Sequence, residues 1–280
     1  MLALCASANG AARDATPRPL AVLPAKLDGY VMAVEAGIRS TSIWFDLDTG
    51  GVHSIIDRSV ADSLGLPAAG VTDVTGAGKG RVEALALRPF TVRLQHVAFQ
   101  LSDPLALDLS RAGSTIGARG LLGFELFHRY VVEFDYDRRT VSLFEPASYV
   151  YRGFGARIPL VIRPPRAFVW AEVAAPGVAP ERHLLRLDTG SSDAVDDDII
   201  LRSNEHKREI TGGVGIGSRF KTYLGSVSSL QIGPYVMHGD LPSATGGVQL
   251  IGTGVWHRFN IVFDFSRSRM YLTPRTAPKA

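Results

Sequence analysis

The sequence repeats two motifs, and this repetition constrains the fold more than any other feature. The tripeptide Asp-Thr-Gly occurs at residues 48–50 and again at residues 188–190, each time after an apolar run. A longer block at residues 121–135 recurs at residues 250–264. Each copy of the block runs from two apolar residues and a glycine, through a His-Arg pair flanked by aromatic residues, to an aspartate. The paired motifs predict an internal duplication, with one Asp-Thr-Gly early and one apolar-apolar-Gly late in each half.

The pattern between these motifs is typical of an all-β chain. Short runs rich in Val, Ile, Leu and aromatic residues alternate with Gly, Pro, Asp or Asn at intervals of about ten residues. Strands are expected at residues 30–34, 41–45, 90–94, 130–134 and 140–144, with closing hairpins at 131–144 and 261–272. Helix is sparse, and its best candidates are residues 57–64 and 124–129.

The composition is that of an ordinary globular protein. Hydrophobic residues make up 46% of the 280 residues and charged residues 20%, so a sizeable core is available. A net charge of +3, evenly scattered, gives no support for binding nucleic acid or a membrane surface. No apolar stretch approaches the roughly 18 residues of a membrane span. The single cysteine, Cys5, rules out an internal disulfide.

Residues 1–24 are expected to lie outside the fold, as a signal remnant and a disordered leader. The first eight residues are rich in Leu and Ala and end in Ala6-Ser7-Ala8, which resembles the tail of a secretory signal without its basic start. This favours a periplasmic or secreted protein. The alternative is a cytoplasmic protein with a loose N-terminus.

The remaining chain divides into two predicted lobes, residues 25–150 and residues 151–275. The boundary near residue 150 is placed between Glu145-Pro146 and the tract at residues 163–165, which both interrupt the strand pattern.

Asp48 and Asp188 are the candidate catalytic residues. Two carboxylates that face each other can share one proton and activate a water molecule between them. The alternative is that each aspartate only caps a turn through hydrogen bonds to nearby backbone N–H groups. That alternative does not explain why both copies keep an acid, a hydroxyl and a glycine in the same order.

Together the tripeptide and the apolar-apolar-Gly segment resemble the pepsin and retropepsin superfamily. The resemblance is to the bacterial single-chain group, in which two retropepsin-like halves are joined, and it covers most of residues 25–274. It implies two similar β-barrel lobes with an active-site cleft between them. It also implies a cofactor-free, monomeric aspartic endopeptidase that acts on a protein or peptide substrate and uses no metal.

The resemblance also assigns supporting residues. In the superfamily the hydroxyls of Thr49 and Thr189 cross-bond the two catalytic loops, and Gly50 and Gly190 permit their sharp turns. The apolar-apolar-Gly segments cross under these loops, where glycine lets backbones approach closely.

Two glycine-rich segments lie where substrate-covering flaps are expected. The first, at residues 74–80, contains Gly76, Ala77 and Gly78, and the second, at residues 211–217, contains Gly213 and Gly215. Neither ends in the Gly-Lys-Ser/Thr sequence of a phosphate loop, nor is a helix expected behind it, which argues against nucleotide binding. The first segment lacks the tyrosine of the pepsin flap.

The residue after each tripeptide predicts an asymmetric pair. Gly51 follows the first copy and Ser191 the second, and a serine hydroxyl can donate to a neighbouring carboxylate and favour its ionised form. Asp188 is therefore expected to be ionised more readily, and Asp48 to carry the proton more often.

Other polar residues receive structural interpretations. His128 and His257 occupy matching positions and are expected to share a structural role, and the remaining histidines lack metal-ligand spacing. The acidic cluster at residues 193–198 is expected to be a solvated loop rather than a calcium site. No Gly-x-Ser-x-Gly elbow supports a serine hydrolase.

Two further classes of function remain open. One is a catalytically silent protein that binds extended peptides in the same cleft by strand addition. The other is a purely structural protein, which would have no need of flexible glycine-rich segments over a cleft.

Overall fold

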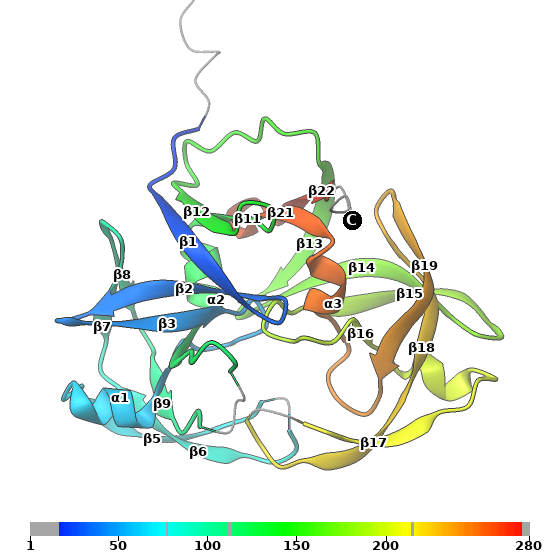
Figure 1. Ribbon diagram of the computed structural model, residues 1–280, viewed down its shortest axis with the longest axis horizontal. Helices are drawn as coiled ribbons and strands as arrows, with labels where there is room; N and C mark the ends of the chain where they lie inside the picture. Colours follow the sequence, from blue (N-terminus) through cyan, green and yellow to red (C-terminus); the bar gives the residue numbers. More distant parts are fainter. Residues whose placement is uncertain (1–16, 77, 111–113, 214–215, 276–280) are drawn as a thin grey trace, which may run out of the picture.

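The structure, a computed structural model, describes residues 17–76, 78–110, 114–213 and 216–275 (Figure 1). Within these residues the chain forms 22 strands, three short α-helices and two 3-10 helices. The protein is mostly β, and the all-β class predicted from the sequence is confirmed.

The elements have the following bounds. Up to residue 144 they are β1 (Ala21–Asp28), β2 (Val31–Ile38), β3 (Thr41–Leu47), β4 (Ile55–Asp57), α1 (Arg58–Ser63), β5 (Ala68–Val74), β6 (Val82–Leu87), β7 (Phe90–Leu94), β8 (Val97–Leu101), β9 (Leu105–Leu107), β10 (Gly120–Leu122), α2 (Phe124–Arg129), β11 (Val131–Asp135) and β12 (Thr140–Phe144). Beyond it they are β13 (Ala156–Arg163), β14 (Arg166–Ala175), β15 (Val178–Leu187), β16 (Val195–Asp196), η1 (Asp198–Arg202), β17 (Arg208–Gly212), β18 (Phe220–Ile232), β19 (Tyr235–Ala244), β20 (Leu250–Ile251), α3 (Thr253–Trp256), β21 (Phe259–Asp264), η2 (Phe265–Arg267) and β22 (Arg269–Pro274).

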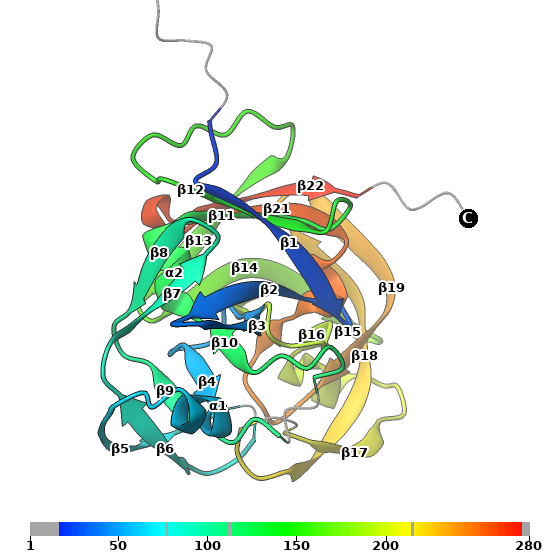
Figure 2. The same cartoon turned by 60° about the vertical axis from the view of Figure 1, so that its left-hand side comes forward.

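Six strands from both parts of the sequence form one antiparallel sheet, in the order β1, β12, β11, β21, β22, β13. At its centre β11 pairs with β21, where Glu133 lies opposite Val262. These two residues hold the same place in the repeated blocks, so the pairing register is symmetric about them. Figures 1 and 2 show this sheet at one end of the molecule, with the remaining strands below it.

Aromatic side chains pack beneath the centre of this sheet. Phe127, Phe134 and Phe263 are fully buried, and their ring centroids lie 5.1 to 6.1 Å apart. Phe263 meets the other two rings edge to face, which is a favourable arrangement for aromatic pairs. The core thereby joins α2 to strands from both parts of the sequence.

Below the sheet, the same strand arrangement occurs twice. β10 pairs in parallel with β3 and antiparallel with β4. β20 pairs in parallel with β15 and antiparallel with β16. β10 and β20 contain the two apolar residues of the apolar-apolar-Gly segments. Their parallel partners, β3 and β15, each lead into an Asp-Thr-Gly tripeptide.

Several expected elements agree closely with the observed bounds. β7, β12 and α2 coincide with the expected ranges. The helix expected at residues 57–64 is α1, which begins one residue later because Asp57 is its N-cap and accepts a hydrogen bond from the Ser59 N–H at 2.9 Å.

The tract at residues 163–165 was expected to interrupt the strand pattern, and the structure places it inside a hairpin. Arg163 lies opposite Arg166, so Pro164 and Pro165 form the turn between β13 and β14, with a cis peptide bond between them. Proline suits such a turn because the two turn residues do not have to donate a backbone N–H to the strand pairing. Among the described residues, no helix is long and apolar enough to cross a membrane.

Candidate active site

The two Asp-Thr-Gly loops lie against each other, joined by the fully buried residues Thr49 and Thr189. Each threonine N–H donates to the hydroxyl of the other threonine at 3.0 Å. The Thr49 hydroxyl donates to the Leu187 carbonyl at 3.0 Å, and the Thr189 hydroxyl donates to the Leu47 carbonyl at 2.7 Å. This crossed network fixes the two loops relative to each other, because leaving any of these buried polar groups unpaired would destabilise the fold.

The network brings the carboxyl groups of Asp48 and Asp188 together. A Cβ atom at Gly50 would overlap the Asp188 carboxyl group, and one at Gly190 would overlap that of Asp48. The Gly50 N–H donates to Asp48 Oδ1 at 2.7 Å, and the Gly190 N–H donates to Asp188 Oδ1 at 3.1 Å. Each glycine therefore holds the carboxyl group of its own loop and leaves room for the other.

The short strands β10 and β20, here named the crossing strands, lie under the two loops and accept hydrogen bonds from them. The Asp48 N–H donates to the Leu122 carbonyl at 3.0 Å, and the Asp188 N–H donates to the Ile251 carbonyl at 3.1 Å. A Cβ at Gly123 would lie 2.6 Å from the Gly51 carbonyl oxygen. The glycine after each crossing strand is therefore required by the closeness of the backbones.

The two carboxyl groups have unlike surroundings. Burial and the charge of Asp188 raise the pKa of Asp48 to about 8. The guanidinium of Arg186 donates to Asp188 Oδ2, and the Ser191 N–H donates to Asp188 Oδ1 at 3.0 Å. Near neutral pH Asp48 therefore keeps its proton, and the donors beside Asp188 favour the charged form of that carboxyl group. The direction is the one expected from the sequence.

The Ser191 hydroxyl is not the donor to Asp188 that the sequence predicts. The Ser191 hydroxyl donates to Asp193 Oδ2 at 3.2 Å, whereas the groups that reach Asp188 are the backbone N–H of Ser191 and the Arg186 side chain. Sequence reasoning missed Arg186. Its signal was strand alternation, because a residue two positions before Asp188 projects from the same strand face.

The glycine-rich segments meet where the β5–β6 and β17–β18 hairpins converge (Figures 1 and 2). Lys79 and Ser218 exchange two backbone hydrogen bonds of 2.9 Å, and the Gly78 N–H donates to the Ile216 carbonyl at 2.8 Å. A Cβ at Gly76 would overlap Ile216. The tips of the two hairpins are thus joined by backbone hydrogen bonds.

The other predicted flap residues have different outcomes. A Cβ at Gly213 would lie 2.9 Å from Gly78 Cα, so these two glycines also lie close together. Ala77 and Gly215 lie outside the described residues.

The acidic cluster is only in part the solvated loop expected from the sequence, because Asp193 and Asp198 are exposed and Asp197 is not. Asp197 is buried, its Oδ2 lies 2.6 Å from His183 Nδ1, and its Oδ1 accepts the Ile199 N–H at the start of η1. Burial and the charge of Asp193 raise the pKa of Asp196 to about 7. Within the described parts of the chain, no group of three or more His, Cys, Asp or Glu side chains could hold a metal ion.

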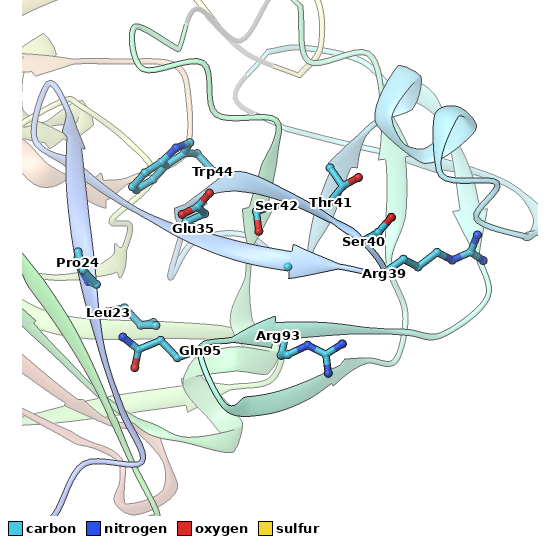
Figure 3. A pocket seen from close by; sticks show the side chains of 11 residues that line it. Leu23, Pro24, Glu35, Arg39, Ser40, Thr41, Ser42, Trp44, Arg93 and Gln95 are labelled. Atoms are coloured by element: carbon cyan, nitrogen blue, oxygen red, sulfur yellow. The ribbon is translucent and has the colours of Figure 1, made fainter.

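A hollow of about 490 Å³ lies away from the two loops, where β1 and β7 approach the β2–β3 hairpin (Figure 3). Leu23, Glu35, Trp44, Arg93 and Gln95 are among its lining residues. Neither aspartate of the paired loops lines it, so it is separate from the candidate active site.

A family model described as aspartyl protease matches residues 34–126, about a third of the chain. The matched segment includes Asp48 and the crossing strand β10. The match supports an aspartic protease family and suggests a proteolytic hydrolase with peptide substrates. No curated protein sequence matches the chain significantly.

Proposed function

We propose that this protein is an aspartic endopeptidase that hydrolyses peptide bonds with a water molecule activated between Asp48 and Asp188. The observation that carries the proposal is the pair of carboxyl groups held together by the crossed threonine hydrogen bonds. The family-model match over the first of the two loops supports it independently.

In the proposed reaction the two carboxyl groups have separate roles. Asp188, paired with Arg186, is the ionised group and takes a proton from the attacking water. Asp48, whose pKa is raised to about 8, is the protonated group and donates to the carbonyl oxygen of the substrate. Both roles need only one shared proton, which is the state that adjacent carboxyl groups favour.

We propose further that the chain is an internal duplication of two β-barrel lobes, residues 25–150 and 151–275, with the catalytic cleft between them. The symmetric register about Glu133 and Val262 supports this, as does the repeated arrangement of β10 and β20. The joined tips of the β5–β6 and β17–β18 hairpins act as flaps over the cleft. The protein works as a monomer, in the periplasm or outside the cell.

The second candidate is a catalytically silent protein that binds extended peptides in the same cleft. The observation that favours it is the contact between Arg186 and Asp188, which occupies one oxygen of a candidate catalytic carboxylate. Strand addition needs only free backbone groups and side-chain pockets, and no ionised carboxylate.

Cleavage of a diverse peptide library between about pH 3 and 8 tests the proposal, with and without a statine-type transition-state mimic. Asp48→Asn and Asp188→Asn are each expected to abolish cleavage, and the mimic to block it. Asp62→Asn, which removes an exposed carboxylate on α1, is the matched control and should cleave normally. Cleavage that survives in either dyad variant would overturn the proposed mechanism, and peptide binding without cleavage would establish the second candidate.

A further inference from the structure

Arg186 and Asp188 form an ion pair inside the candidate active site. Both lie on the same face of the chain, because Arg186 is two residues before Asp188 at the end of β15. The Arg186 side chain is 16% exposed and the Asp188 side chain 7% exposed. An ion pair this well shielded from water is weakened far less by salt than one on the surface.

Every donor that the structure places on Asp188 favours its charged form. Arg186 Nη2 donates to Oδ2, and the N–H groups of Gly190 and Ser191 donate to Oδ1 at 3.1 and 3.0 Å. A carboxylate that accepts two or three such bonds holds its negative charge firmly.

The equivalent position in the other loop holds an acidic residue instead of a basic one. Asp46 stands two residues before Asp48, as Arg186 stands two residues before Asp188. Asp46 Oδ1 is buried and has no hydrogen-bond partner among the described residues. The two halves of the site therefore differ by a guanidinium on one side and a carboxyl group on the other.

We propose that Arg186 is a positioning residue of the dyad, which keeps Asp188 as the carboxylate so that the single proton of the pair stays on Asp48. This inference deepens the proposed function and rests on it. It makes the dyad directional before substrate binds, with Asp188 always the base and Asp48 always the acid.

The other charged groups near Asp188 oppose ionisation, which leaves this role to Arg186. Asp48 faces Asp188 from the other loop, and Asp196 approaches from β16, with Asp193 beside Asp196. All three are acidic, and a nearby negative charge disfavours a second one. A guanidinium remains protonated across the working range of any protease, so its effect on Asp188 does not change with pH.

The test is a pH titration of the aspartate carboxyl carbons by ¹³C NMR in the full chain. The dyad signals are assigned with Asp48→Asn and Asp188→Asn. In Arg186→Met the midpoint of the Asp188 signal should rise by about one to three pH units, the range for removal of an adjacent opposite charge. Arg186→Lys should restore much of the original midpoint, because it keeps the charge without the planar fork.

Arg182→Met is the matched control. Arg182 is an exposed arginine on the same strand, stacked over Trp170 at 4.6 Å, and its loss changes the net charge equally. It should move the Asp188 midpoint by less than about 0.3 units, since exposed charges are screened. If Arg186→Met does not fold, Arg186→Gln carries the same test. An Asp188 midpoint that is unmoved in the neutral variants, or moved as much by Arg182→Met, would overturn the inference.

The titration separates this inference from the proposed function. If the protein cleaves no peptide but Asp188 titrates as expected, Arg186 holds the carboxylate and the proposed activity falls. If cleavage occurs, the acidic limb of kcat/KM should move upward in Arg186→Met together with the Asp188 midpoint. A protease whose acidic limb stays fixed in that variant would show that Arg186 has no such role.

Discussion

At the residue scale, Asp46 is a carboxyl group that the fold accommodates at a cost. Burial and the nearby charge of Asp28 raise its pKa to about 7, and its Oδ1 atom has no hydrogen-bond partner in the described part of the chain. An acid whose pKa is raised on folding weakens stability once the pH exceeds its unfolded pKa, because the folded state must then give up a proton that it holds tightly. The penalty grows up to the folded pKa and is constant above it.

Asp46→Asn should therefore stabilise the protein in a pH-dependent way. At pH 8.5 the variant should be more stable than the parent by roughly 1–3 kcal/mol, since each pKa unit corresponds to about 1.4 kcal/mol. At pH 4 the two proteins should unfold alike, because Asp46 is then protonated. Urea unfolding at both pH values measures the difference.

Asp62→Asn serves as the control for that comparison. It removes one carboxylate from an exposed surface pair with Arg58, and such pairs contribute less than about 1 kcal/mol. An Asp46→Asn variant that is no more stable at pH 8.5 than at pH 4, relative to the parent, would show that Asp46 is ionised in the fold without penalty.

At the element scale, the helical turns after β4 and β16 are fastened by different chemistry. Asp57 caps α1 and pairs with Arg119 at 2.7 Å, whereas Asp197 caps η1 and pairs with His183 at 2.6 Å. Burial alone would raise the pKa of Asp57, but the bonds from Arg119 and Ser59 lower it to about 2. Burial alone would lower the pKa of His183, but the hydrogen bond and charge of Asp197 raise it. Of the two pairs, only the one between Asp197 and His183 changes its charge near neutral pH.

His183→Gln should thus destabilise the protein more at acidic than at alkaline pH. A histidine whose pKa is raised on folding contributes stability below its unfolded pKa of about 6.5 and loses it as the pH passes its folded pKa. The expected cost at pH 5.5 is roughly 1–3 kcal/mol, the value of a charged hydrogen bond, and less at pH 9.

Arg119→Gln is the matched variant for the other turn. The arginine is charged and Asp57 is ionised at both pH values, so its loss should cost the same free energy of unfolding at pH 5.5 and pH 9. If the loss of unfolding free energy in His183→Gln is also the same at pH 5.5 and pH 9, His183 is neutral at both pH values.

The glycine after each crossing strand allows a second test of an element. Gly123→Ala places a methyl group against the carbonyl oxygens of Gly51 and His53, at 2.6 and 2.8 Å. The strand cannot retreat without breaking its bond to the Asp48 loop, so a loss of about 1–3 kcal/mol is expected by thermal or urea unfolding. Gly247→Ala, where the nearest side-chain atom lies at 3.9 Å, should cost much less. Similar losses in both would show that the backbone around Gly123 relaxes freely.

Local signals in the sequence are enough to predict some of these elements and not others. β12 lies between turn residues and α2 follows Gly123, so both are marked by neighbouring residues. The Pro164-Pro165 pair marks an interruption of the strand pattern, but only the pairing of β13 with β14 shows that this interruption is a hairpin turn. Asp197 was expected to be solvated because its partner, His183, is 14 residues away and becomes a neighbour only when β15 folds back.

The candidate site, too, could be predicted only in part from local sequence. The motif itself predicts that Asp48 and Asp188 come together, because both copies carry the same three residues. The partner of Asp188, Arg186, is not part of the motif. The sequence instead suggested Ser191, the residue that follows the motif, as the partner. Strand alternation places Arg186 beside Asp188, but the contact depends on a side-chain conformation that only the packed strand determines.

At the scale of the whole molecule, two strand pairings between described residues join the proposed lobes, in addition to the crossed threonine hydrogen bonds. One is the six-stranded sheet, whose centre is the pairing of β11 with β21. The other is the contact between the hairpin tips, which consists of three backbone hydrogen bonds between residues 78–79 and 216–218. The first is buried over aromatic side chains, whereas Ser218 in the second is exposed. The sheet is therefore the better shielded connection, and the joined tips are the one that the proposed function requires to separate when substrate enters.

Locking the tips should stop catalysis if peptides enter beneath them. Lys79 and Ser218 form a hydrogen-bonded antiparallel pair, whose Cα atoms are about 5.5 Å apart, within the range that a disulfide spans. In a Cys5→Ser background, Lys79→Cys with Ser218→Cys should lose peptide cleavage on oxidation and regain it with dithiothreitol. Lys79→Cys alone should be insensitive to oxidant. An oxidised double variant, shown by mass spectrometry to be cross-linked but still fully active on folded and peptide substrates, would mean that substrates reach Asp48 and Asp188 by another path.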